Sequence, residues 1–307
     1  MANNSNKVTF IGCGRVGMSS AFALLLDGIA NQIVLLGRCR DDIVGEQLDL
    51  EHGMPFVSQT TVLATENYHD IADSDIVVIT AGASQKPGDT RLDLTAKNIE
   101  VIESIIPQVV EHAPDAIIVI VSNPVDVLTY HAYRLAGWPK GRIFGSGTVL
   151  DTARFRVHLA EFLHVNPTSI HAYILGEHGD SSFAALNQAT IGGRPLATFP
   201  HFSEDKSQRA FRLAKDAAYH IIQSKGATYY AIAIVILKII KTVLRDARSI
   251  LPVSIPLHQY YGLNGVALSV PCIVGRQGVT DAIEIKLSWD EKQLLERSAK
   301  VVQEYLP

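Results

Sequence analysis

Three side chains in the middle of the sequence have the types and spacing needed to work on a small acid. Asp151 and Arg154 are three residues apart, so on a helix they would share a face, and His178 stands further along in a Gly-Glu-His-Gly-Asp segment. An arginine can hold a carboxylate through two parallel hydrogen bonds. A histidine can pass a proton to or from the adjacent oxygen, while an aspartate fixes its tautomer and stabilises the imidazolium. The set suits a 2-oxo or 2-hydroxy acid.

The same residues also have a plainer interpretation. Asp151 and Arg154 would then form a structural ion pair, and His178 would lie in an unrelated loop. Short motifs do not decide between the two, because they also occur by chance. The decision depends on whether the rest of the chain can position these side chains and bind a reaction partner.

The composition is that of an ordinary globular protein and excludes several classes of partner. With 307 residues, the chain is long enough for two domains or one large α/β unit. A net charge of −4 gives no basic surface for nucleic acid or anionic membrane, and the longest apolar stretch is too short to cross a bilayer. Three scattered cysteines and the lack of a secretory signal lead us to expect a cytoplasmic protein. The eleven histidines form no zinc pattern, so we expect no metal.

The first half of the chain alternates short apolar runs with helical patterns. Strands are predicted at residues 8–11, 33–36, 76–80 and 116–121, with weaker candidates at 61–64 and 142–144. Helices are predicted at 18–26, 43–51 and 99–111. This alternation indicates an α/β fold with a doubly wound parallel sheet, in which ligands bind beyond the carboxyl ends of the strands. We expect a dinucleotide-binding domain at 1–145 and a catalytic domain at 146–307.

The second half predicts a mixed α/β domain. Helical patterns cover residues 152–162, 207–224 and 228–247, and antiparallel strands are expected at 170–175, 266–273 and 282–285. Ser288 and Glu291 form a capping box, so a last helix should begin there.

A Gly-x-Gly-x-x-Gly pattern at Gly12, Gly14 and Gly17 directly follows the first predicted strand and opens the first helix. In that setting the glycines allow a tight turn, a close approach of the backbone to a pyrophosphate, and close packing of helix on strand. The helix N-terminus adds free N–H groups and a positive dipole end. We therefore predict a dinucleotide site, although glycine-rich turns are common elsewhere.

Two further segments follow predicted strands and could contact the ligands. Asn123 can hydrogen-bond a nicotinamide ribose or the substrate, or it can simply make a turn with Pro124. The polar segment that runs from Ala81 to Arg91 is either a plain surface loop or a lid. As a lid it would bring Arg91 to a bound substrate, where it could polarise the carbonyl.

With these residues identified, the whole chain resembles the L-lactate/malate dehydrogenase family, and within it the bacterial L-lactate dehydrogenases. The motifs that carry the resemblance agree in order and spacing: the glycine pattern, the 85–91 loop, Ser-Asn-Pro at 122–124, Asp151 to Arg154, and Gly-Glu-His-Gly at 176–179. The resemblance implies a Rossmann domain with a nicotinamide cofactor, a mixed α/β catalytic domain, and a homotetramer or dimer.

The resemblance also implies a role for each site residue. His178 would be the proton donor and acceptor and Asp151 its partner, while Arg154 would bind the substrate carboxylate. Arg91 would stabilise the reacting carbonyl, with Thr228 lining the pocket and Ile232 packing against the nicotinamide. A non-catalytic redox-sensing protein of the same fold remains an alternative, but it should have a damaged catalytic set.

The identity of residue 85 predicts the substrate. Gln85 occupies the loop position where malate dehydrogenases of the family carry arginine. Oxaloacetate would bury a second carboxylate beside a neutral amide, whereas pyruvate presents a methyl group there. We therefore expect pyruvate and lactate, with malate and larger 2-oxo or 2-hydroxy acids as alternatives. The L configuration follows from the resemblance alone.

Arg156 and His171 match the positions at which members of the family activated by fructose-1,6-bisphosphate bind that effector across a subunit interface. At about 100° per helical residue, Arg156 should point away from Arg154 and the active site. A solvated arginine and a structural histidine are the alternative.

The strongest departure from the family lies at residues 37 and 38. NAD-linked members carry an acidic residue about 20 positions beyond the glycine pattern, where it binds the adenosine ribose. Here Gly37 stands at that position and is followed by Arg38 and Arg40. Loss of the acid removes repulsion, and arginine can bind a 2′-phosphate. We expect NADP(H) to be tolerated and preferred over NAD(H), unless Gly37 only forms a turn.

Overall fold

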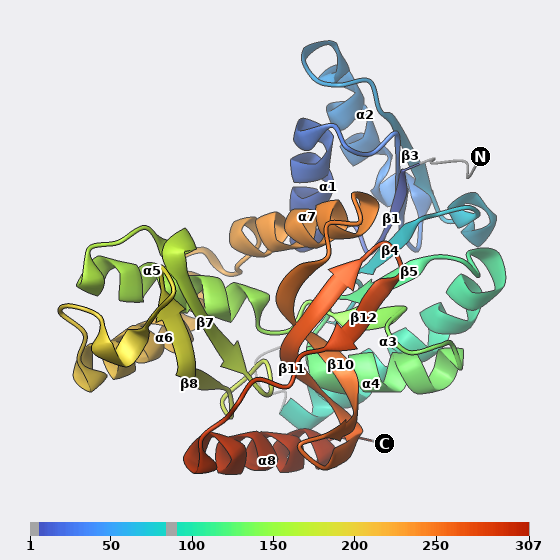
Figure 1. Cartoon of the computed structure of the whole chain (residues 1–307). Coiled ribbons are helices and arrows are strands. Elements are labelled where there is room, and N and C mark those ends of the chain that lie inside the picture. The colour runs from blue at the N-terminus through green and yellow to red at the C-terminus, as the bar shows by residue number, and fades with distance from the viewer. Residues whose placement is uncertain (1–5, 84–90, 307) are drawn as a thin grey trace.

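The first half of the chain forms a parallel sheet with helices on both faces. The computed structural model describes residues 6–83 and 91–306, arranged as in Figure 1. Six parallel strands lie in the order β3-β2-β1-β4-β5-β6. They are β1 (Lys7–Ile11), β2 (Gln32–Leu36), β3 (Thr61–Thr65), β4 (Ile76–Ile79), β5 (Ile117–Ile120) and β6 (Ile143–Gly145). The helices are α1 (Arg15–Asp27), α2 (Val44–His52), α3 (Arg91–His112) and α4 (Val125–Ala136). The predicted doubly wound fold is confirmed.

Apolar residues on both faces of each strand explain why this sheet is covered twice. In β4, Ile76 and Val78 pack into the core that includes residues of α1 and α7 (Tyr230–Leu244), while Val77 and Ile79 pack into the core with α3 and α4. All four side chains are fully buried. Successive strand residues point to opposite faces, so a four-residue apolar run serves two cores at once.

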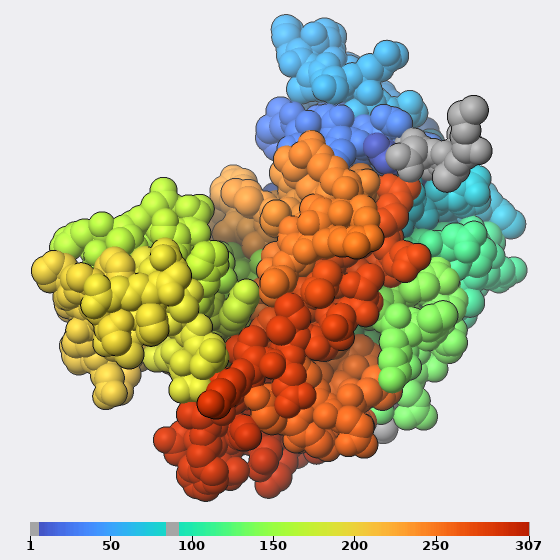
Figure 2. Space-filling view, viewed as in Figure 1, coloured from blue at the N-terminus to red at the C-terminus, as the bar shows by residue number. Residues whose placement is uncertain are grey.

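The second half extends the same sheet and adds a small second one. β10 (Ser249–Tyr260) joins β6 antiparallel, with Ser254 opposite Gly145, and β11 (Leu263–Gly275) and β12 (Gly278–Ala282) follow. β7 (Ile170–Leu175), β8 (Phe183–Ile191) and β9 (Arg194–Pro195) form the small sheet. The remaining helices are α5 (Val149–Leu163), α6 (Glu204–Lys225), α7 and α8 (Trp289–Gln303). The lobe of α5, α6, β7 and β8, green to yellow, projects beside the orange and red segments (Figure 2).

The strand predictions for the second half were incomplete. β8 and β10 were not predicted, and the strand expected at 282–285 lies earlier, as β12. Prolines explain the omission of β10, since Pro252 and Pro256 interrupt an otherwise strand-like run. In the structure Pro252 of β10 lies directly opposite Pro271 of β11. Directly opposite residues of an antiparallel pair alternate between those that exchange two hydrogen bonds and those that exchange none. The two prolines occupy a position of the second kind, so their missing N–H groups break no hydrogen bond between the two strands. The predicted capping box of Ser288 and Glu291 is present at the start of α8.

The part of the chain that the structure describes has neither a membrane-spanning helix nor a cluster of metal ligands. Across 6–83 and 91–306, no helix is long and apolar enough to span a membrane. The same residues contain no group of three or more His, Cys, Asp or Glu side chains that could hold a metal ion. The three cysteines are free, and burial beside Glu46 raises the pKa of the Cys13 thiol to about 12.

Candidate active site

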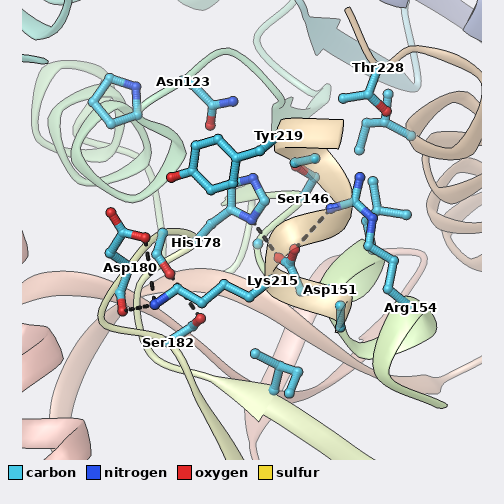
Figure 3. Close-up of a pocket in the computed structure, with 18 of the residues that line it drawn as sticks. Asn123, Ser146, Asp151, Arg154, His178, Asp180, Ser182, Lys215, Tyr219 and Thr228 are labelled. Carbon is cyan, nitrogen blue, oxygen red and sulfur yellow. Dashed lines mark hydrogen bonds and ion pairs between the residues drawn. The ribbon is translucent and has the colours of Figure 1, made fainter. Parts of the chain in front are cut away.

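A cavity of about 570 Å³ lies at the carboxyl ends of the parallel strands, where residues that follow β5 and β6 face residues of α5 and α6. Its walls come from the segment after β5, from α5, from the loop after β7, from α6, and from the start of α7. Among the residues predicted for the site, the cavity is lined by Asn123, Asp151, Arg154, His178, Thr228 and Ile232. Figure 3 labels the first five of these side chains and shows how they are arranged around the cavity. The location follows the rule for doubly wound sheets.

His178 and Asp151 form a tight pair in this cavity. His178 lies in the loop after β7, and its Nδ1 is 2.5 Å from Asp151 Oδ2. Asp151 also accepts a hydrogen bond of 3.3 Å from Arg154 Nη1, one turn further along α5 (Figure 3). With Nδ1 bound to the carboxylate, Nε2 is the ring nitrogen left to exchange a proton with a ligand.

The charges in this cluster raise the proton affinity of the imidazole. The negative charge of Asp151 outweighs the effect of burial and raises the pKa of His178 to about 9, and the hydrogen bond that the ring donates to Asp151 and the charge of Asp126 add to it. Burial by itself would raise the pKa of Asp151, but the attraction of His178 and Arg154 leaves it below its usual value. His178 is therefore protonated, and Asp151 ionised, at neutral pH.

Arg154 has a donor left over for a ligand. Its side chain is only 11% exposed, and Nη2 is buried without a hydrogen-bond partner among the described residues. A buried N–H of a cation that makes no bond is costly. A substrate carboxylate in the cavity would satisfy it, so this atom points to an anionic ligand beside His178.

Asn123, Thr228 and Ile232 reach the same cavity from other elements. Asn123 lies between β5 and α4, and its Oδ1 accepts a long hydrogen bond of 3.3 Å from Val125 N, so the turn interpretation describes part of its geometry. Its backbone oxygen accepts a bond from the buried Asn98 of α3, which holds the segment in place. Thr228 lies in the α6–α7 loop, and Ile232 is in the first turn of α7.

The loop between β4 and α3 is described only at its two ends. Gln85 lies outside the described residues, so its predicted contact with the substrate stays a prediction. Arg91 is the first residue of α3. α3 therefore begins where the predicted lid would end.

The glycine pattern is built as a nucleotide-binding turn requires. Gly12 has φ +101°, and a Cβ there would lie 2.5 Å from Ala81 N. A Cβ on Gly17 would lie 2.1 Å from Gly12 O, so only glycine lets α1 approach the turn this closely. At Gly14, the N-cap of α1, a Cβ would meet nothing within 4 Å, which leaves the N–H groups of the first turn open to a ligand. These residues fit a bound pyrophosphate.

The backbone does not require glycine at position 37. Gly37 follows β2 and donates its N–H to Thr65 O of β3, and its φ is outside the left-handed range. A Cβ there would meet the flexible Ile43 side chain at 3.3 Å and Cys39 O at an ordinary contact distance of 3.9 Å. Arg38 is exposed, and its guanidinium makes no ion pair or hydrogen bond within residues 6–83 and 91–306. Two residues further along, the backbone N–H of Arg40 donates a hydrogen bond of 2.9 Å to the Glu66 carboxylate.

Arg156 and His171 lie away from the cavity. Arg156 Nε donates to Ala172 O of β7 at 2.9 Å, and its guanidinium stacks over the Tyr173 ring at 5.2 Å. His171 is exposed and, two residues before Tyr173, shares its face of the strand. The two predicted effector residues thus lie on one side of β7.

Sequence reasoning missed a whole wall of the cavity. The wall is one face of α6, and its residues are Phe211, Ala214, Lys215, Ala218, Tyr219 and Ile222. Lys215 Nζ donates to Asp180 O at 2.7 Å, which ties α6 to the loop of His178 (Figure 3). The i, i+3, i+4 spacing within the predicted helix was a signal that could have revealed this face. Asp126, which contacts the backbone of His178, was also missed.

Comparisons with known proteins agree with this arrangement. Residues 6–145 match the family model described as the lactate/malate dehydrogenase NAD binding domain, and residues 148–306 match the corresponding alpha/beta C-terminal domain. The chain is 46% identical to L-lactate dehydrogenase 1 of Clostridium acetobutylicum, over 98% of each chain. It is 42% identical to the L-lactate dehydrogenase of Lacticaseibacillus casei, over 98% of this chain and 93% of that one.

Solved structures show the same likeness in three dimensions. The minor L-lactate dehydrogenase of Enterococcus mundtii, in a ligand-bound form, superposes with a TM-score of 0.95 at 38% identity, covering 99% of this chain and 98% of that one. A lactate dehydrogenase from a deep-sea metagenome library of the Medee basin gives 0.93 at 35% identity, covering 98% of both. The chain belongs to the lactate/malate dehydrogenase family.

Proposed function

We propose that this protein is an L-lactate dehydrogenase, which interconverts pyruvate and L-lactate with a nicotinamide cofactor. The observation that carries the proposal is the half-buried trio of Asp151, Arg154 and His178, in which a paired histidine lies beside an arginine whose Nη2 has no partner among the described residues. The names of the relatives agree with it. The trio is intact, which argues against the non-catalytic redox sensor.

Each residue of the site has a defined task in this proposal. Arg154 binds the substrate carboxylate, and His178 donates a proton to the carbonyl oxygen in reduction and removes it in oxidation. Asp151 holds the ring and stabilises its charge. The cofactor, held at Gly12, Gly14 and Gly17, supplies the hydride. Arg91, which we assign to the carbonyl, completes the set from the start of α3.

The direct test of the proposal is an assay of purified protein with pyruvate and NADH or NADPH, followed by loss of nicotinamide absorbance. We expect turnover with pyruvate and production of L-lactate. Binding of cofactor without turnover of any 2-oxo acid would support the sensor instead.

We assign pyruvate rather than oxaloacetate on the identity of Gln85. A neutral amide leaves a second substrate carboxylate without a partner, and that costs several kcal/mol when buried. Gln85→Arg should therefore shift preference toward oxaloacetate. Wild-type protein that already prefers oxaloacetate, or a larger 2-oxo acid, would contradict the assignment.

We also assign a preference for NADP(H) over NAD(H). Gly37 occupies the place of the usual acid although its backbone does not require glycine, which weakens the turn interpretation. The free guanidinium of Arg38 beside it suits a 2′-phosphate. The ratio of kcat/KM for NADPH and NADH at fixed pyruvate measures this, and a ratio well below one would contradict it.

Regulation and assembly complete the proposal. We infer a homo-oligomer, a tetramer, with fructose-1,6-bisphosphate bound near Arg156 and His171 at a subunit interface. Their location on one face of β7, away from the cavity, supports an effector site separate from the active site. Titration of fructose-1,6-bisphosphate at low pyruvate, with the mass measured by light scattering, tests both parts. No change in rate or mass would remove the effector.

A further inference from the structure

A second cavity, of about 290 Å³, lies apart from the candidate active site. Its lining comes from the end of α4, the loop before β6, the end of β10, and β12 with the residues after it, and none of these residues lines the first cavity. Lys140 and Gly141 precede β6, whereas Ser146 and Gly147 of the first cavity directly follow it. The two cavities therefore lie at opposite ends of that strand. The volume suits a small molecule.

Irregular strands form two walls of this second cavity. On β10, the register with β11 shifts on both sides of His258, and Gln259 has φ +59°, in the left-handed region. On β12, the register shifts between Val279 and Asp281, so that Thr280 is an extra residue without a partner on β11. Such bulges turn side chains out of the regular alternation of a strand and are frequent beside binding sites. Here the irregular positions bring His258, Gln259 and Thr280 to the cavity.

Part of the lining is apolar or aromatic. Ile255 and Leu257 of β10 are buried beneath the cavity surface. The ring of Tyr133, from α4, stands edge-on to the ring of His258, with the two centroids 6.3 Å apart and the planes at 71°. This part of the cavity can contact the apolar side chain of a small ligand.

Charges of both signs line the same cavity without pairing. Lys140 supplies a cation, and Asp281 and Glu284 supply carboxylates, and all three residues are exposed. None of the three side chains forms an ion pair or a hydrogen bond within residues 6–83 and 91–306. Partial burial and the charge of Lys140 lower the pKa of His258, so this ring is neutral at pH 7 and can both donate and accept a hydrogen bond. The cavity thus separates a cation from two carboxylates.

A free amino acid has the groups that complement this lining. Its carboxylate can pair with an ammonium group, its ammonium with a carboxylate, and an apolar side chain can cover the apolar part. A ligand with a single charge would leave the groups of one sign without a partner. We propose that the second cavity binds a free α-amino acid with an apolar side chain, whose carboxylate is bound by Lys140 and whose ammonium is bound by Asp281 and Glu284. This site is independent of the proposed function, because the two cavities share no residue.

Isothermal titration calorimetry of the full-length protein with L-phenylalanine and with L-leucine tests the proposal. We expect one site per chain with a Kd of about 0.1 to 1 mM, the range for a ligand of this size in an open cavity. N-Acetyl-L-phenylalanine lacks the ammonium and 2-phenylethylamine lacks the carboxylate, so each should bind at least about 5-fold more weakly than L-phenylalanine. Equal or tighter binding of either compound overturns the proposed ligand class, and absence of binding by both amino acids overturns the site.

Variants of the charged residues locate the binding. Lys140→Met should weaken L-phenylalanine about 5-fold and leave 2-phenylethylamine no weaker, whereas the double variant Asp281→Asn with Glu284→Gln should weaken both. These side chains are exposed, so the variants should fold as the wild type does. Lys300→Met is a matched control, because Lys300 is an exposed lysine of α8 that lines neither cavity. It should bind L-phenylalanine as the wild type does.

The first cavity offers a competing location, since Arg154 could bind the carboxylate of an amino acid there. Saturating pyruvate together with oxidised cofactor should therefore leave the binding of L-phenylalanine unchanged. Displacement by pyruvate overturns the inference, and so does wild-type affinity in both Lys140→Met and the double variant. Binding at the second cavity without pyruvate turnover would instead keep this inference and reject the proposed function.

Discussion

The proposed substrate site and the proposed adenosine site are built in opposite ways. At the substrate end, Asp151, Arg154 and His178 are bonded to one another in a cavity. At the adenosine end, Gly37 and Arg38 follow β2 near the edge of the sheet, and the guanidinium of Arg38 is exposed and unbonded among the described residues.

The difference indicates at which residues a substitution can change specificity with little loss of stability. A change among these three half-buried side chains leaves a charge or donor without its partner, which costs several kcal/mol. A change at residues 37 and 38 disturbs no bonded side chain, and exposed charges contribute little to stability. On the proposed roles, we therefore expect the reaction to depend on interactions that tolerate little change, and the choice of cofactor to depend on residues that are free to vary.

The largest expected effect comes from His178→Asn. The variant removes the proton donor and acceptor, so kcat for pyruvate reduction should fall by about 10²- to 10⁴-fold. Binding of the reduced cofactor, measured by fluorescence, should change little because the glycine turn is untouched. A loss of cofactor binding equal to the loss of kcat would mean that the two ends are not independent.

Arg154→Lys should come next. Lysine keeps the charge but cannot form the two-pronged contact with a carboxylate, so kcat/KM for pyruvate should fall by about 10- to 100-fold, mostly through KM. Steady-state kinetics at saturating cofactor measure it. An unchanged KM would show that the buried Nη2 faces something other than substrate.

The pH dependence should follow the proton on His178. Because its pKa is raised to about 9, pyruvate reduction, which needs the protonated ring, should be level from pH 7 to 8. Above about pH 9 its kcat/KM should fall about tenfold per unit, while lactate oxidation should rise as the ring loses its proton. A fall in kcat/KM for pyruvate reduction centred near pH 6.5 would contradict the charge balance described for Asp151, Arg154 and His178.

The double variant Gly37→Asp with Arg38→Val should alter only the proposed adenosine site. The ratio of kcat/KM for NADPH and NADH should fall about tenfold, because repulsion replaces one charge-assisted hydrogen bond. The KM for pyruvate and the melting temperature should stay near wild type, since the one tight contact of a Cβ at position 37 is with the flexible Ile43 side chain. A large loss of stability would contradict this.

Glu66→Gln should give the smallest effect, in the opposite direction. Glu66 lies next to the β3 residue that bonds Gly37, and its carboxylate should repel a 2′-phosphate. Its neutralisation should raise the NADPH to NADH ratio by about 2- to 5-fold, less at high salt because exposed charges are screened.

The parts that the sequence predicted well are those with a strong local pattern. Buried strands such as β4 and the glycine turn have unambiguous composition, and the fold class was confirmed through them. β10 was hidden by Pro252 and Pro256, because their tolerance depends on what lies across the strand. The residue that a proline faces in the neighbouring strand cannot be identified from the local sequence.

The site was predictable where motifs carry chemistry and not where packing assembles it. Asp151, Arg154 and His178 were identified from type and spacing, and they meet in the structure. Asp126 and the α6 face around Lys215 were missed, because their contacts with the His178 loop join elements far apart in sequence. The division of the chain at Gly145 stays a prediction.

The pairing of β6 with β10 limits how this chain can be recombined with its relatives. Ser254 pairs with Gly145, and the same serine reaches Asp126 on α4. A chimera that exchanged residues 146–307 as a module would cut through one continuous sheet and through the α1–α7 contact beside it. A chimera that takes both β6 and β10 from one parent should keep this pairing intact, whereas exchange at residue 145 should combine strands that do not match.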